Sequence, residues 1–242
     1  MINIVIPMAG EGKRFKVNGY NDPKPFIKFK GKMMIEHVLE GLMVSGANYI
    51  LIIREEFMEH HYDKLNILRK RFPVKFIVVE KLTQGASCTA LAAHKYINNE
   101  FPVIFADADN IFENSAFKIF LSSAINNELD GCIMTFKSSE PCFSYVLLDQ
   151  KNNVIKTKEK EVISDLAIAG VYMFNKGSCF VESAIDMMIY GDKDKGEYYM
   201  SNVYNWAIKK NRKIGISMIE KDDWVCVGTP KQLEEYLSKN CS

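Results

Sequence analysis

Net charge is almost absent from this sequence, and that limits the partners it can have. Its 31 basic and 30 acidic residues leave a formal net charge of +1 at pH 7. A protein that binds nucleic acid normally carries a clear excess of Lys and Arg on one face. We therefore expect no nucleic-acid partner.

Cysteine pairs are also missing. The 242-residue chain has six cysteines, and no two of them form a CxxC pair. This scatter argues against a zinc site or a disulfide framework and fits a reducing compartment. The six are Cys88, Cys132, Cys142, Cys179, Cys226 and Cys241.

Long apolar runs, repeats and flexible linkers are absent too. The first apolar run ends at Pro7, which is too short for a signal peptide, and no run approaches the roughly 20 residues of a membrane span. We expect a cytoplasmic protein without a membrane partner. With no linker rich in Gly, Pro or Ser, residues 1–242 are predicted to form one domain.

Short buried strands alternate with helical patterns over the first half of the chain. This order predicts right-handed βαβ units around a parallel sheet. The predicted strands are Ile2–Pro7, Tyr49–Ile53, Val74–Val79 and Val103–Phe105, and the predicted helices are Met33–Val44, Glu55–Arg71 and Ser87–Ile97, the last with Ser87 as its N-cap.

The pattern changes after about residue 130, where strand-like segments separated by turns suggest an antiparallel part of the sheet. Here the predicted strands are Cys132–Phe136, Tyr145–Leu148, Val154–Lys156, Ile168–Phe174 and Ile214–Met218, and the helices are Cys179–Met188, Met200–Lys209 and Gln232–Leu237. The predicted fold class is α/β, with a Rossmann-like, mixed but mostly parallel sheet flanked by helices.

A glycine-rich turn follows the first strand, at the sheet edge where ligands of α/β proteins lie. Glycines let backbone N–H groups approach an anion closely, and a nearby basic side chain can reach the same phosphates. A bare turn between a strand and a loop is the simpler interpretation of the glycines alone. The candidate nucleotide-binding residues here are Met8, Ala9, Gly10, Gly12, Lys13 and Arg14.

Ten residues after Arg14, the string Pro23-Lys24-Pro25 holds a lysine on a stiff backbone. Alone, Lys24 would be an ordinary surface lysine. Together, G-x-G-x-R and P-K-P resemble the signature of the nucleotide-diphospho-sugar pyrophosphorylases, the sugar-nucleotidyltransferase family. The resemblance implies that Gly10, Gly12, Arg14 and Lys24 hold the triphosphate of an NTP, with Arg14 and Lys24 as catalytic cations.

The resemblance extends from Ile2 to about Leu237 and implies a division of labour. It places a nucleotide-binding half at about 1–130 and an acceptor-binding half at about 131–242. In the turn before the third predicted helix, Gln84, Gly85 and Ser87 are then candidates to contact the nucleotide base. An ordinary strand-to-helix turn explains these three residues equally well.

Two aspartates follow the strand Val103–Phe105. Carboxylates at the carboxyl end of a strand suit Mg²⁺, a hard cation that takes oxygen ligands and phosphates. The family's metal aspartate maps onto Asp109, while Asp107 is assigned to the nucleotide site. The alternative is that both merely cap a turn.

The candidate acceptor site lies in the second half. Family members carry an E-K pair on a strand, and its lysine, which contacts the acceptor phosphate, maps onto Lys160. Gly170 and Glu197 are the other acceptor-binding candidates. The alternative is that Lys156, Lys158 and Lys160 form one solvated strand face.

The string from Trp224 to Thr229 departs from the family pattern. Many members have W-x-D-x-G-T, whose aspartate is a second metal ligand, but Cys226 stands in that place. A thiolate is a poor ligand for Mg²⁺. Either one carboxylate and the substrate phosphates hold the metal, or Asp222 or Asp223 substitutes.

The sequence thus predicts an Mg²⁺-dependent nucleotidyltransferase that uses an NTP, with CTP favoured, and a small phosphorylated acceptor, and that releases pyrophosphate. A sugar phosphate, phosphocholine or phosphoglutamine serves as acceptor in short cytidylyltransferases of this kind, some of them for surface-polysaccharide or capsule synthesis. The alternatives are a glycosyltransferase with Asp107-Ala108-Asp109 as its D-x-D motif, and a non-catalytic nucleotide-binding regulator. A homo-oligomer is left open.

Overall fold

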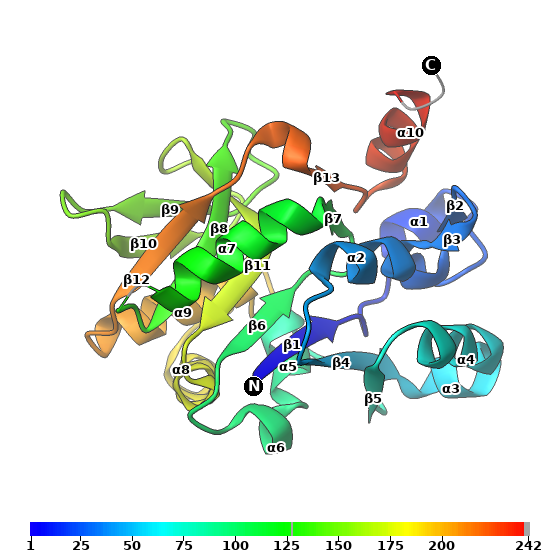
Figure 1. The fold of residues 1–242 in the computed structure, drawn as a ribbon, viewed down its shortest axis with the longest axis horizontal. Coiled ribbons are helices and arrows are strands. Elements are labelled where there is room, and N and C mark those ends of the chain that lie inside the picture. The colour runs from blue at the N-terminus through cyan, green and yellow to red at the C-terminus, as the bar shows by residue number, and fades with distance from the viewer. Residues whose placement is uncertain (127, 240–242) are drawn as a thin grey trace.

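Apolar runs of the sequence become the central strands of a nine-stranded sheet in the computed structural model, which describes residues 1–126 and 128–239. Figure 1 shows the sheet crossing the molecule, with helices packed on it. Its strands are β1 (Ile2–Pro7), β4 (Ala47–Arg54), β5 (Val74–Val79), β6 (Val103–Ala106), β8 (Gly131–Lys137), β9 (Tyr145–Leu148), β10 (Val154–Lys158), β11 (Leu166–Phe174) and β12 (Ile214–Met218).

The sheet is mixed around a parallel core, as predicted. Strand β1 pairs in parallel with both β4 and β6, and β4 pairs in parallel with β5. Strand β11 runs antiparallel to β6, β8 and β9 and so joins the two parts of the chain. The chain moves from β1 to β4 on one side and later returns to β6 on the other, which makes the β1–β6 boundary a topological switch point.

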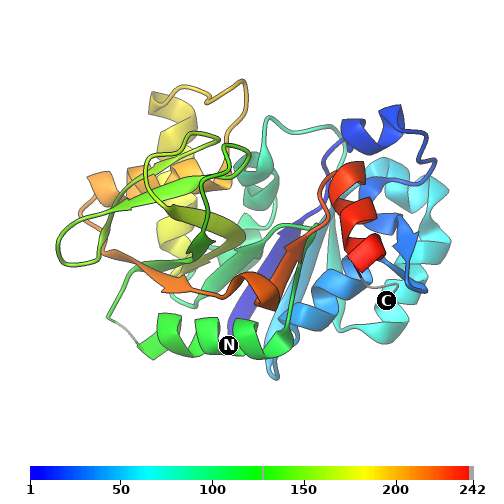
Figure 2. The same ribbon diagram turned by 90° about the horizontal axis from the view of Figure 1, so that it is seen from above.

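Helices cover both faces of the sheet (Figure 2). Alternate residues of β1 point to opposite faces, so Ile4 and Ile6 belong to one buried cluster and Val5 to another. The first cluster lies under α2 (Met34–Leu42), α3 (Glu55–His60), α4 (Tyr62–Arg71) and α7 (Asn114–Asn126), and the second under α5 (Ala86–Leu91), α6 (His94–Ile97), α8 (Gly177–Tyr190) and α9 (Met200–Lys209).

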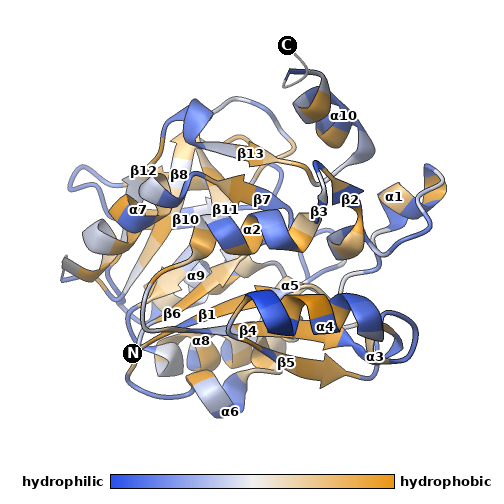
Figure 3. Cartoon of the chain, turned by 45° about the vertical axis from the view of Figure 1, so that its right-hand side comes forward, coloured by the Kyte–Doolittle hydropathy of each residue, from blue (hydrophilic) through white to orange (hydrophobic). Residues whose placement is uncertain are grey.

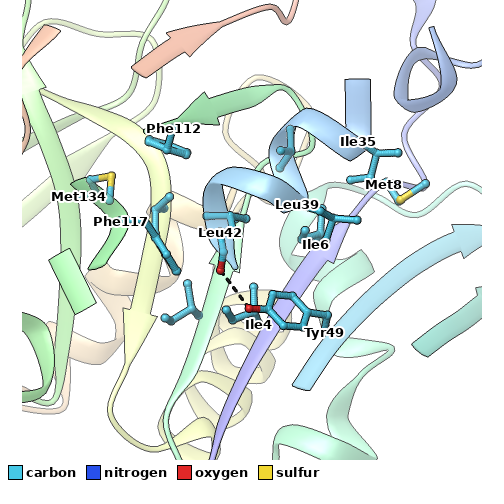
Figure 4. Packing of buried hydrophobic residues seen from close by; sticks show 14 of the residues in the cluster. Ile4, Ile6, Met8, Ile35, Leu39, Leu42, Tyr49, Phe112, Phe117 and Met134 are labelled. Carbon is cyan, nitrogen blue, oxygen red and sulfur yellow. Dashed lines mark hydrogen bonds between the residues drawn. The ribbon is translucent and has the colours of Figure 1, made fainter. Parts of the chain in front are cut away.

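Close packing fixes the first of these layers. Leu39 of α2 lies beside Ile6 of β1, and the Tyr49 hydroxyl donates a hydrogen bond to the Leu42 carbonyl over 3.1 Å (Figure 4). The polar end of a buried tyrosine thereby satisfies a carbonyl at the end of a helix. Figure 3 shows the resulting contrast, with hydrophobic central strands and hydrophilic outer helix faces.

A third buried cluster holds the segments that follow the glycine-rich turn. Phe15, Phe29 and Leu233 form its centre. It joins α1 (Lys13–Val17), the hairpin of β2 (Lys28–Phe29) and β3 (Lys32–Met33), and α10 (Pro230–Lys239), which lies beside them in Figure 1. The short helical turn η1 (Lys24–Phe26) leads into this hairpin, so the lysine of the P-K-P string is placed by a packed unit.

Three predictions about helices were wrong. The helix predicted over Glu55–Arg71 is interrupted at His61, and the one predicted over Ser87–Ile97 is interrupted between α5 and α6. Ser87 is not an N-cap, because the helix begins one residue earlier, after Gly85. The Ser87 hydroxyl instead donates to the Tyr198 carbonyl over 2.8 Å. None of the helices within 1–126 and 128–239 has the length and apolar character that a membrane span requires.

Candidate active site

The glycine-rich turn leaves the carboxyl end of β1 and forms one wall of a cleft. Gly12 has a φ of +66°, and a Cβ built on it would lie 3.2 Å from the Lys24 Cβ. Both the backbone and the approach of Lys24 therefore favour glycine at this position. Gly10 is exposed, with open space where a side chain would lie.

Lys24 points from η1 to the acidic side of the cleft. Its ammonium forms an ion pair with the Asp109 carboxylate, and both side chains are about four-fifths buried. Pro25 and Phe26 are buried directly after it and hold the backbone in place. Lys13 and Arg14 are exposed at the same mouth. Cations from two segments thus line one cleft.

The acidic wall comes from the carboxyl end of β6. The Asp107 N–H donates to the Gly170 carbonyl over 2.9 Å, which ties this end to β11. Burial, reinforced by the charge of the neighbouring Asp109, raises the pKa of the Asp107 carboxyl well above its usual range. Asp109 precedes β7 (Asn110–Phe112), a short strand that pairs with β13 (Trp224–Cys226).

Gly170 lies behind the aspartates. Its φ is +77°, and a Cβ there would lie 2.5 Å from the Asp107 Oδ2 and 2.2 Å from the Asn110 Nδ2. The register of β11 against β8 also shifts in this region. Gly170 therefore allows Asp107 and Asn110 to pack against the strand, and it does not line the cleft itself.

Glu159, Lys160 and Tyr199 also line the cleft. The sequence had suggested that Lys160 lies on a strand, and this was wrong. Strand β10 ends at Lys158, and Lys160 has a φ of +51°. Its ammonium lies 3.5 Å from the Glu159 carboxylate and donates to the Tyr199 hydroxyl over 3.2 Å. This lysine therefore faces the cleft and is no member of a solvated strand face.

These walls enclose a cleft of about 430 Å³ at the switch point between β1 and β6. Of the residues predicted from the sequence, its lining includes Met8, Gly10, Gly12, Lys13, Arg14, Lys24, Asp107, Asp109, Lys160 and Glu197. A single cavity therefore brings together the segments that the sequence analysis assigned to an NTP, a metal and an acceptor.

Five predicted residues lie outside this lining: Ala9, Gln84, Gly85, Ser87 and Gly170. Ala9 is buried beneath the turn. Glycine is required at position 85 for a local structural reason, because a Cβ there would lie 2.4 Å from the Tyr198 carbonyl oxygen. Their neighbour Ala86 does line the cleft.

The structure adds four lining residues with polar side chains that were not predicted as site residues: Ser144, Glu159, Tyr172 and Tyr199. Glu159 is buried, and its carboxylate accepts hydrogen bonds from the Ser144 and Ser201 hydroxyls, the latter over 3.1 Å. A glutamate beside an assigned lysine was a usable signal. No local sequence pattern identifies Ser144, and only the fold shows that it lines the cleft.

Cys226 lies next to the metal candidate. In the β7–β13 ladder it is opposite Asn110, and a Cβ built on Gly228 would lie 2.5 Å from the Asp109 Oδ2 and 3.3 Å from the Cys226 Sγ. Burial, with a contribution from the charge of Asp109, raises the pKa of the Cys226 thiol to about 12. Cys226 is therefore a neutral thiol, which has little affinity for Mg²⁺.

Neither Asp222 nor Asp223 can take the place of the missing carboxylate in this arrangement. They belong to the helical turn η2 (Lys221–Asp223), ahead of β13, and line a separate cavity of about 720 Å³. The Asp223 carbonyl accepts a hydrogen bond from the Glu113 N–H, at the far end of β7 from Asp109.

The aspartate pair has the chemistry of a partial site for a divalent cation. The Asp109 carboxylate lines the cleft, Asp107 lies beside it, and the Asn110 Oδ1 is buried without a hydrogen-bond partner among the described residues. Within 1–126 and 128–239, no three His, Cys, Asp or Glu side chains converge on one point. A cation here would complete its shell with phosphate oxygens and water, as Mg²⁺ commonly does.

The sequence matches the model of a family described as nucleotidyl transferase over residues 4–241. The chain belongs to that family. This confirms the resemblance at the level of the family. Members of the family typically use a divalent metal.

Relatives agree with this assignment. The chain is 28% identical over 239 residues to the bifunctional protein GlmU of Methanocaldococcus jannaschii, covering 97% of the chain and 53% of that protein. It is 27% identical over 176 residues to the catalytic subunit beta of mannose-1-phosphate guanylyltransferase of Drosophila melanogaster, covering 71% and 47%. The chain thus spans about half the length of these curated relatives.

Solved structures share the fold. A nucleoside-diphosphate-sugar pyrophosphorylase from Vibrio cholerae superposes with a TM-score of 0.85 at 22% identity, covering 97% of this chain and 99% of the other. The inositol-1-phosphate CTP transferase from T. maritima superposes with a TM-score of 0.78 at 18% identity, covering 98% and 93%. These similarities confirm the predicted α/β nucleotidyltransferase fold.

Proposed function

We propose that this chain transfers the nucleotide of an NTP to a small phosphorylated acceptor and releases pyrophosphate. The observation that carries the proposal is the single cleft at the β1–β6 switch point. Arg14, Lys24, Lys160 and the two aspartates all line it, and Lys24 is paired with Asp109. A glycosyltransferase would leave the glycine-rich turn and Lys24 without a role.

In the proposed reaction, an oxygen of the acceptor phosphate attacks the α-phosphorus in line. A bond forms between that oxygen and the α-phosphorus, and the bond from the α-phosphorus to the bridging oxygen breaks, so pyrophosphate leaves. No side-chain nucleophile is needed. Catalysis then comes from positioning and from charges aimed at the phosphates.

Each cation has a separate part in this scheme. Arg14 and Lys24 hold the triphosphate and stabilise the negative charge that builds on the departing pyrophosphate. Lys160 binds the acceptor phosphate and aims its attacking oxygen. The turn from Met8 to Gly12 leaves its backbone N–H groups close to the phosphates, because Gly10 and Gly12 add no side chains there.

Asp109, with Asp107 beside it, would hold Mg²⁺ at the cleft. A bound Mg²⁺ would neutralise phosphate charge and bring the phosphate oxygens into a fixed geometry. Cys226 takes no part as a ligand in this proposal, because its thiol stays protonated. Lys24, already paired with Asp109, lies next to the same charges.

CTP is the nucleotide we propose, and the acceptor is a sugar phosphate, phosphocholine or a phosphoglutamine-like compound used in surface-polysaccharide or capsule synthesis. Support comes from the resemblance to short cytidylyltransferases. A cytoplasmic location and Gln84 as a base contact belong to the same proposal. UTP, dTTP and GTP with a sugar 1-phosphate are the nearest competitors.

A pyrophosphate-release screen tests the proposal. The purified chain is incubated with Mg²⁺, with each of the four NTPs and with a panel of phosphorylated acceptors that includes sugar 1-phosphates, phosphocholine and phosphoglutamine. We expect release that requires both substrates and is fastest with CTP. Release with no pair above that of an Asp109→Asn control would contradict the proposed reaction.

A further inference from the structure

A short segment between α8 and α9 contributes Glu197 and Tyr199 to the lining of the cleft. We define the strap as residues Asp194–Tyr199. Its turn is tight, because the Asp194 and Glu197 backbones exchange hydrogen bonds of 3.0 and 2.9 Å. The two residues between them, Lys195 and Gly196, both have positive φ, as a two-residue hairpin turn requires.

One end of the strap is fastened to the Gln84–Ser87 turn. The Tyr198 N–H donates to the Gln84 carbonyl over 2.9 Å, and the Tyr198 carbonyl accepts from the Ser87 hydroxyl over 2.8 Å. Gly85 leaves room for this backbone contact, since any Cβ there would meet the Tyr198 main chain. The position of Tyr199, the next residue, is therefore fixed by main-chain contacts.

The strap also holds Lys160 at two points. The Lys195 ammonium donates to the Lys160 carbonyl over 2.9 Å, and the Lys160 ammonium donates to the Tyr199 hydroxyl over 3.2 Å. The same ammonium lies 4.7 Å from the centre of the Tyr199 ring. Both the backbone and the charged end of Lys160 are thus held in one position.

We infer that Tyr199 is a positioning residue that holds the Lys160 ammonium in place for the acceptor phosphate. The inference rests on the proposed function, in which Lys160 binds that phosphate. A lysine has a long flexible side chain, and ordering it on binding costs entropy. A hydroxyl that accepts one of its three N–H groups restrains the side chain and still leaves an N–H group for the acceptor, even with Glu159 3.5 Å from the same ammonium.

The electrostatics of Lys160 agree with this geometry. Burial by itself lowers the pKa of the Lys160 ammonium, but the hydrogen bond to Tyr199 and the charge of Glu159 raise it by more, so its net pKa is raised. The lysine therefore stays charged while it is held.

The neighbouring tyrosine provides a matched control. The Tyr198 hydroxyl donates to the Met188 carbonyl over 3.4 Å, and Tyr198 does not line the cleft. Tyr198→Phe and Tyr199→Phe each remove one hydroxyl from the same segment and keep the ring. A general loosening of the strap would affect both variants, whereas loss of the Lys160 contact affects only the second.

Kinetics with each substrate varied form the first test. Because the contact involves a charged but half-exposed group, Tyr199→Phe should raise the acceptor KM about 5- to 20-fold. It should leave the NTP dissociation constant unchanged, and Tyr198→Phe should behave as wild type. In a Lys160→Ala background, Tyr199→Phe should have no further effect. A full additional loss in that background would overturn the inference.

A second measurement needs no enzymatic turnover. The rate at which an amine-selective reagent modifies Lys160 is followed by peptide mass spectrometry at fixed pH, with Lys158 as internal reference. We expect Tyr199→Phe to speed modification of Lys160 severalfold, because a freed amine has a lower pKa. Equal rates in Tyr199→Phe and wild type would overturn the inference. A faster rate in a chain that releases no pyrophosphate would contradict the proposed function and leave the contact established.

Discussion

At the scale of single residues, two glycines distinguish a requirement of the backbone conformation from a requirement of substrate binding. Gly12 has a positive φ and is in close contact with Lys24, whereas Gly46 has a φ of +76° with open space around it. An alanine at either position has a similar backbone cost, of about 1 kcal/mol. Only at Gly12 would it also displace a cation of the cleft.

Gly12→Ala should therefore weaken NTP binding about tenfold, because the added methyl group moves Lys24 away from the phosphates. Gly46→Ala should lose similar thermal stability and keep wild-type affinity. Titration calorimetry with NTP and Mg²⁺, together with thermal denaturation, measures both effects. Equal NTP affinities in the two variants would contradict the role assigned to the glycine-rich turn.

The acidic wall leads to a second prediction at this scale. Asp109→Asn removes the carboxylate that we assign to Mg²⁺ and should lower kcat about 100-fold or more. Asp222→Asn is the matched control, since Asp222 lines the separate cavity, and it should remain active. Excess EDTA should inactivate the wild type, and full activity in EDTA would contradict a metal role.

Cys226 leads to a third prediction at the scale of single residues. Because it is a neutral thiol that the proposal leaves out of the metal site, Cys226→Ser should keep its kcat within about threefold of wild type. The measurement is steady-state kinetics over a range of Mg²⁺ concentrations. A marked loss of activity, with a raised Mg²⁺ requirement, would show that the sulfur contributes to metal binding after all.

At the scale of elements, strands were more predictable than helices. The apolar runs that form β1, β4 and β6 are easy to recognise, because strands buried on both faces need hydrophobic residues at nearly every position. The interruption of the helix at His61 could not be predicted, because residues 55–71 contain no Gly or Pro. Helix α7 was not predicted, although Phe117, Phe120 and Ala124 follow a helical spacing.

One side chain of α7 also bonds directly to the end of α2. The Asn114 amide donates to the Gly41 and Met43 carbonyls over 3.0 and 2.8 Å, which satisfies the carboxyl end of α2. Asn114→Ala should lower the free energy of unfolding by about 1–2 kcal/mol without changing either KM. Chemical denaturation measures this, and exposed Lys118→Ala on the same helix should show no such loss.

At the scale of the whole molecule, the sheet explains why residues predicted from separate motifs line one cleft. Strands β1 and β6 are adjacent, so the turn after one and the aspartates after the other meet without any contact having been known in advance. The contact between Lys160 and Tyr199 joins residues 39 positions apart and depends on the strap, which no sequence pattern reveals. The division into a nucleotide half and an acceptor half stays a prediction.

That division can be tested with Lys24 and Lys160, two lysines that line the same cleft. A charge-assisted contact that strengthens in the transition state is worth about 2–4 kcal/mol, or about 100- to 1000-fold in rate. Lys24→Ala should lose NTP affinity and slow catalysis with every acceptor. Lys160→Ala should keep its NTP affinity. It should raise the acceptor KM, lower kcat, or do both. Calorimetry and two-substrate kinetics decide, and parallel losses of NTP binding would mean that both lysines serve the nucleotide.

The strap has a thermodynamic consequence for the order in which ligands bind. One end contacts the Gln84–Ser87 turn and the other holds Lys160, so a nucleotide that stiffens the first end reduces the entropy still to be lost at the second. Such coupling is reciprocal: the factor by which NTP improves acceptor affinity must equal the factor by which acceptor improves NTP affinity. Calorimetric titrations in both orders should give one shared cooperativity factor in the wild type. Lys195→Ala, which cuts the strap from the Lys160 carbonyl, should reduce that factor toward one.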